Sequence, residues 1–83
     1  MNDLSRLRWR CRRGIREMDL LLQHFLDTVY PTLSDHERRV FARLLDESDH
    51  DLLDWITGRW PVPVPDYASL ISQLRQFHPA AER

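Results

Sequence analysis

The imidazole and thiol groups of this sequence, which are frequent zinc ligands and nucleophiles, come from four histidines and one cysteine, Cys11. No two histidines lie four residues apart, and a single cysteine cannot supply a thiolate cage for zinc, so we expect no metal site. Two histidines fall in the first turns of predicted helices, where a charged imidazole would oppose the helix dipole, and we interpret them as neutral surface or capping-region residues. The four are His24, His36, His50 and His78, and the two at helix starts are His36 and His50.

Sequence motifs for nucleotide binding and hydrolysis are also missing. Gly14 and Gly58 are the only glycines, so neither GxGxxG nor GxxxxGK[ST] can be formed, and no GxSxG nucleophile elbow occurs. Cys11 lies between two arginines, which can activate a thiol, but we interpret it as a spare, partly buried thiol because free cysteine usually behaves as a small apolar residue. We therefore expect no catalytic residues, no stably bound cofactor and a function that is not enzymatic.

Three residues, Arg13, Gly14 and Glu17, are not explained by helix formation alone. Glycine near the start of a well-patterned helix costs about 0.5–1 kcal/mol relative to alanine, so the missing side chain needs a reason. A tight turn with positive φ would supply one, close approach of a partner's backbone to the bare Cα would supply another, and the two can coexist. Glu17 lies four residues after Arg13, so the two could pair on one helix face, which would contribute only about 0.3–0.5 kcal/mol.

Apolar residues at helical spacing predict the elements that must position this motif, and no segment has the pattern of a strand. Residues 4–11 form a short helical candidate with Leu4, Leu7 and Cys11 on one stripe and Trp9 off it. A longer amphipathic helix is predicted from Ile15 onward, and Pro31 ends it because proline disfavours a helical conformation at the preceding Tyr30. Its apolar positions are Met18, Leu22, Phe25, Leu26 and Val29.

Serine caps predict where the next two helices begin. Ser34 followed by Glu37 is a capping box, and Ser48 followed by Asp51 is a second start signal of the same kind. Gly58 is placed to take the left-handed conformation that closes the second of these helices.

Proline at every second position from 61 to 65 predicts a stiff connection, with a proline-rich ligand for another domain as the functional alternative. Asp66 is predicted to cap a last helix over about 67–77, which Pro79 stops. The apolar stripe of that helix is Tyr67, Leu70, Ile71, Leu74 and Phe77.

The length of 83 residues limits the chain to one domain, and the helix signals predict a small all-α domain, a five-helix bundle over residues 1–83. It is 42% hydrophobic and 30% charged, with a net charge of −1 and a mean hydropathy of −0.54, and no apolar run approaches the ~20 residues needed to span a bilayer. Six arginines lie within residues 6–16 and five acids within 46–54, while lysine is absent. These segregated charges suit steering toward a protein partner, or they are simply two solvated faces. The arginine-rich start could be a mitochondrial targeting segment, but cleavage would remove the only distinctive motif, so we expect a cytoplasmic protein.

The segment 12–19, RRGIREMD, resembles the RGxxE signature of the succinate dehydrogenase assembly factors, a family of bacterial FAD assembly factors and their mitochondrial relatives. Further positions in 33–37, 41–45 and 49–55 match the family pattern in order and spacing, so the resemblance covers residues 6–58. Met18 stands where leucine is usual, and the segment with Trp60 and the prolines matches less closely.

The resemblance implies a chaperone-like factor that binds the flavoprotein subunit of succinate dehydrogenase, and of fumarate reductase, and promotes covalent attachment of FAD to a histidine of that subunit. The FAD then belongs to the client protein. We expect a monomer that neither binds nucleic acid nor inserts into a membrane. The predicted partner-binding residues are Arg13, Gly14 and Glu17, which the family carries as its working surface, and also Trp9, Arg12 and Asp19.

Two other functions remain open on sequence grounds. The arginine cluster with Trp9 would also suit a nucleic-acid-binding module, although the overall pI of about 6.4 argues against it. An antitoxin-type protein that neutralises a partner is the second alternative.

Overall fold

The chain forms five α-helices and one short 3-10 helix in a computed structural model that describes residues 3–77. No strand occurs within these residues, which confirms the predicted all-α class. The helices are α1 (Asp3–Arg10), α2 (Arg16–Thr28), η1 (Tyr30–Thr32), α3 (Asp35–Leu44), α4 (Asp49–Thr57) and α5 (Pro65–Phe77).

The caps predicted from the sequence lie at the start of α3 and at both ends of α4. The Ser34 hydroxyl accepts from the Glu37 amide at 3.2 Å, and the Glu37 carboxylate accepts from the Ser34 amide at 3.0 Å, so the predicted capping box is present. The Ser48 hydroxyl accepts from the third amide of α4 at 3.1 Å. Gly58 closes α4 with a φ of +80°, as predicted.

Proline marks the end of α2 and the start of α5. Helix α2 ends at Thr28, three residues before Pro31, which lies inside η1. The predicted start of the last helix is wrong. Helix α5 begins at Pro65, so Asp66 lies in its first turn and does not cap it. Proline suits the first helical position because its φ is already helical and the amide it lacks would have no partner there. The side chain of Phe77, and residues from 78 onward with Pro79, lie outside the described part.

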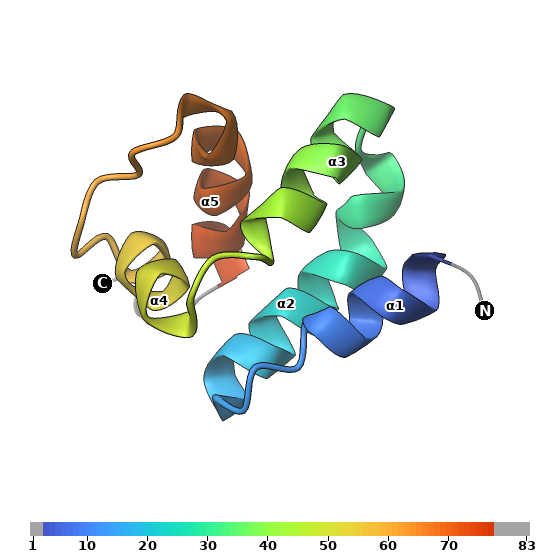
Figure 1. The fold of residues 1–83 in the computed structure, drawn as a ribbon, viewed down its shortest axis with the longest axis horizontal. Coiled ribbons are helices and arrows are strands. Elements are labelled where there is room, and N and C mark those ends of the chain that lie inside the picture. The colour runs from blue at the N-terminus through green and yellow to red at the C-terminus, as the bar shows by residue number, and fades with distance from the viewer. Residues whose placement is uncertain (1–2, 78–83) are drawn as a thin grey trace.

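The core forms where α5 packs against α2, α3 and α4, while α1 lies along α2 at the edge of the bundle (Figure 1). The Phe25 and Phe41 rings stack with centroids 5.1 Å apart and join α2 to α3. Helix α1 contributes Leu7 and the adjoining Cys11 to the core, but Leu4 is 43% exposed, so its predicted place on the buried stripe is wrong. The radius of gyration is 11.9 Å, close to the roughly 12 Å expected for a compact domain of this length.

None of the helices described here has both the length and the apolar character required to cross a membrane.

Candidate functional site

Gly14 lies in the turn that joins α1 to α2 and adopts a φ of +84°. This confirms the first of the two reasons predicted for glycine here, because other residues rarely take positive φ. Gly14 is exposed, and a Cβ built on it would meet no atom within 4 Å. The bare Cα therefore faces open space, and the second reason, close approach of a partner, stays a prediction.

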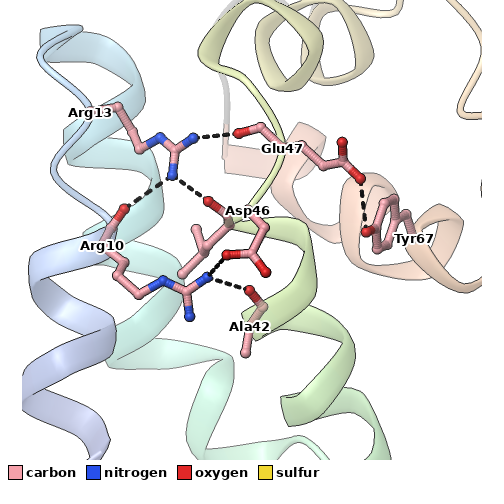
Figure 2. Close-up of polar contacts among 7 residues, drawn as sticks. Arg10, Arg13, Ala42, Asp46, Glu47 and Tyr67 are labelled. Atoms are coloured by element: carbon pink, nitrogen blue, oxygen red, sulfur yellow. Dashed lines mark hydrogen bonds and ion pairs between the residues drawn. The ribbon is translucent and has the colours of Figure 1, made fainter.

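Arg13 points from this turn toward the loop between α3 and α4 (Figure 2), and its side chain joins three parts of the fold. Its Nε donates to Asp49 Oδ1 at 2.6 Å, and the side chain is only 14% exposed. Its Nη1 donates to the carbonyls of Arg10 and Leu45, and Nη2 donates to the carbonyl of Glu47. The guanidinium thus links the end of α1 to the loop between α3 and α4 and to the first turn of α4.

Asp19 fixes the same turn from the α2 side. Its carboxylate accepts a hydrogen bond from the backbone amide of Arg13. The expected pairing of Arg13 with Glu17 on one helix face is wrong, because α2 begins at Arg16 and Arg13 lies outside it. Arg13 and Asp19 therefore both have partners within the molecule, and together they hold the backbone around Gly14.

The other predicted site residues are exposed around the turn, and we call Trp9, Arg12, Gly14 and Glu17 the turn surface. Trp9 is 68% exposed, and the Arg12 guanidinium lies 5.4 Å from the centroid of its ring. A groove of about 380 Å³ opens beside them between α1 and α2, lined by Ser5, Arg8, Trp9, Arg12 and Gln23.

Leu20 is a residue of this region that the sequence analysis missed. It lies three residues after Glu17 on α2 and is 62% exposed, which is unusual for a leucine in an amphipathic helix. The sequence could have indicated this exposure, because Leu20 lies off the apolar stripe of α2 that contains Met18 and Leu22. The exposed side chains of Leu20 and Trp9 add apolar surface of the kind that suits protein contact to α2 and α1.

Comparison with known proteins places this chain in a family. Residues 5–78 match the protein family described as "Flavinator of succinate dehydrogenase". The chain belongs to this family. The match runs through α5 and so extends beyond residues 6–58, on which the sequence resemblance rested.

Two similar members of the flavinator family are bacterial. The FAD assembly factor SdhE of Shewanella oneidensis is 42% identical over 73 residues, which cover 88% of this chain and 89% of the relative. The FAD assembly factor SdhE of Coxiella burnetii is 34% identical over 73 residues, with the same coverage of both chains.

Cys11 does not add reactivity to the site of this flavinator-family member. Its side chain is fully buried, and burial raises the pKa of the thiol to about 11, although Arg8, Arg13 and Arg10 act in the opposite direction. A neutral, covered thiol is a poor nucleophile, which agrees with the interpretation of Cys11 as a packing residue.

The histidines do not form a site with one another in residues 3–77. No group of three or more metal-binding side chains comes together in this range. His36 is exposed in the first turn of α3. His50 is 80% exposed in the first turn of α4, with Nε2 3.4 Å from Asp54 Oδ2.

Proposed function

We propose that this chain is a FAD assembly factor that binds the flavoprotein subunit of succinate dehydrogenase, and of fumarate reductase, and promotes covalent attachment of FAD to a histidine of that subunit. Membership of the flavinator family and the names of the two bacterial relatives support this function. The observation that carries the proposal is an exposed glycine with open space at its Cα, held in a turn by the internal contacts of Arg13 and Asp19.

The residues around the turn divide into two roles in this proposal. The turn surface contacts the client, with the bare Cα of Gly14 allowing close backbone approach and Glu17 and Arg12 supplying directional polar contacts. Arg13 and Asp19 act through the backbone, since their side chains are already bonded within the molecule. They hold the turn in the shape that the client meets.

The factor promotes the reaction without catalytic groups of its own. Binding to one conformation of the client shifts the client's population toward it, and a conformation that aligns flavin and histidine lowers the barrier by orientation. Orientation of reacting groups can be worth several kcal/mol, with an upper range of about 7–11 kcal/mol. The FAD and the acceptor histidine both belong to the client, and the chain works as a monomeric cytoplasmic protein in this proposal.

A matched pair of glycine substitutions tests the turn surface. Gly14 and Gly58 have φ values of +84° and +80°, and neither has an atom within 4 Å of a built Cβ. Gly14→Arg and Gly58→Arg should therefore cost similar stability, about 1–2 kcal/mol each from the left-handed backbone. Only Gly14→Arg should abolish co-purification with the flavoprotein subunit and the covalent-flavin fluorescence of that subunit in a strain lacking the chromosomal gene.

Glu17→Ala is the companion variant without backbone strain. We expect its melting temperature to stay close to that of the parent, because exposed substitutions usually change stability by no more than about 0.5 kcal/mol. Flavinylation should nevertheless fall sharply. If Gly14→Arg and Gly58→Arg lose flavinylation equally, or if Glu17→Ala supports it fully, the turn surface is not the docking face. Normal flavinylation in the strain without any copy of the gene would refute the function itself.

A further inference from the structure

A second groove, which we call the α1–α3 groove, is lined by four arginines and no acidic residue. It lies between α1 and α3, next to η1, and has a volume of about 280 Å³. Its lining residues are Arg6, Leu7, Arg10, Tyr30, Arg38, Arg39 and Ala42. Such a concentration of guanidinium groups is notable in a chain whose net charge is −1.

The four guanidinium groups of the groove differ in how many hydrogen bonds and ion pairs they form within the molecule. Arg10 bridges α1 to α3, since it donates to the carbonyl of Ala42 and pairs with Asp46 (Figure 2). Arg6 and Arg39 are exposed and form no ion pair with any side chain described by the structure.

Arg38 lines the groove and is half-buried. Its guanidinium stacks over the Tyr30 ring at 5.0 Å and donates one hydrogen bond to the Pro31 carbonyl at 3.0 Å. A guanidinium has five N–H donors, so Arg38 keeps donor capacity beyond this bond. The planar fork of a guanidinium is pre-organised, so little side-chain entropy is lost for each hydrogen bond that it forms with an acceptor.

The α1–α3 groove is separate from the turn surface. The two grooves share no lining residue, since the first is bounded by α1 and α2 and the second by α1, η1 and α3. At 3.6 residues per turn, Arg6 and Arg10 lie about 60° and about 100° around α1 from Trp9, and Arg12 follows the end of that helix. A partner segment in the α1–α3 groove would thus leave the turn surface open.

We propose that the α1–α3 groove binds an acidic segment of a protein partner, with side-chain carboxylates seated among Arg6, Arg38 and Arg39. Charge complementarity argues for this occupant, because guanidinium groups bind carboxylates through paired, charge-assisted hydrogen bonds. Leu7 and Tyr30 add an apolar wall against which the methylene groups of acidic side chains pack. Glutamate-rich peptide is therefore the chemistry that fits the groove.

The extent of the groove favours a short peptide over nucleic acid. Helix α1 has eight residues, or about 12 Å of length, whereas duplex DNA carries a charge every ~1.7 Å along a continuous track. Beyond the groove, Asp46 adjoins Arg10 and Asp27 pairs with Arg8 on α1. Asp46 and Asp27 would repel a phosphate backbone that continued past the arginines. A short peptide with a few carboxylates would bind within the groove and would not extend to these two aspartates.

The test uses a fluorescein-labelled hexaglutamate peptide as the probe, with hexaglutamine as its uncharged control, and measures fluorescence anisotropy with the full chain. We expect hexaglutamate to bind at low ionic strength and weaken with added salt, and hexaglutamine to show no binding. Arg6→Gln/Arg39→Gln should lower the affinity about tenfold through the loss of two guanidinium partners. The matched control Arg43→Gln/Arg59→Gln removes the same charge from exposed positions outside the groove. Its affinity for hexaglutamate should stay within about twofold of the parent, and its fold should be unchanged because the Arg43–Asp66 ion pair that it loses is long and exposed.

Amide chemical shifts of the isotope-labelled chain locate the peptide, with circular dichroism showing that each variant is folded. Shift changes on titration should centre on Leu7, Tyr30 and Ala42. Equal loss of affinity in both double variants, or shift changes centred on Gly14 and Glu17, would overturn the proposal. It would also be overturned if a single-stranded or duplex oligonucleotide bound the groove more tightly than hexaglutamate at the same salt concentration. Flavinylation is not a readout here, so the result is independent of the function proposed above.

Discussion

Replacing Arg13 with methionine is the most direct test of the internal role assigned to this arginine. The substitution keeps a long side chain but removes the ion pair to Asp49 and the bonds to three carbonyls. Asp49 is 40% exposed, so solvent screens the ion pair and we assign it no more than about 1 kcal/mol. The two shorter carbonyl bonds contribute about 1 kcal/mol each, and the total is about 3 kcal/mol.

A loss of this size would be large for so small a domain. Total stability for 83 residues is about 4–12 kcal/mol, and 3 kcal/mol corresponds to a fall in melting temperature of roughly 12–24 °C. Urea unfolding followed by circular dichroism measures the loss. Arg13→Lys, which keeps the charge and fewer donors, should recover part of it.

The matched comparison for Arg13→Met is Arg12→Met, one residue away. Arg12 is exposed and its described partner is the Trp9 ring, so its loss should cost about 0.5–1 kcal/mol. If Arg13→Met unfolds at the same urea concentration as the parent and yet fails to bind the flavoprotein subunit, the side chain acts at the interface. The internal role assigned to it would then be wrong.

Three further results are expected. Buried Cys11 should not react with a thiol reagent at pH 8 until the protein unfolds. Because the pKa of its thiol is raised from 9.0 to about 11 in the folded state, its contribution to stability should be lost as pH rises from about 9 to 11. A pH series of urea unfolding measures this loss. Ser34→Ala should cost about 1 kcal/mol in urea unfolding. Hydrogen bonds from Ser34 hold the pKa of Glu37 below 4.5, so this pKa should rise in an NMR titration of the same variant. In the parent, the ionised Glu37 carboxylate stabilises the fold above pH 4.5, and this contribution is lost as pH falls. Leu74→Ala, at a fully buried position of α5, should cost about 2–5 kcal/mol in the same unfolding assay because it leaves a cavity.

Features set by near neighbours in the chain were predictable from the sequence. The capping box at Ser34 and Glu37 and the closure of α4 at Gly58 each depend on residues within one helical turn. The apolar stripe of α2 was also predictable, since Met18, Leu22 and others recur with the helical period. The positive φ of Gly14 belongs to the same class, because glycine before a helix indicates a turn.

Features set by distant partners were not predictable. Arg13 bonds to Asp49, which is 36 residues away in the sequence, so its inward orientation follows from how α1 and α2 pack on the α3–α4 loop. Leu4 has the spacing of a core residue, but α1 lies at the edge of the bundle and leaves that position uncovered. Pro65 was ambiguous because proline suits both an extended connection and the first position of a helix.

The central place of α5 has a consequence for how the protein is made. This helix packs against α2, α3 and α4 (Figure 1), yet it follows all three in chain order and is joined to them through a proline-rich connection. During translation the earlier helices therefore leave the ribosome with the surface that α5 will cover still open to solvent. The stable fold forms only after α5 has emerged, and a nascent chain arrested at Pro61 would present that apolar surface to chaperones and proteases.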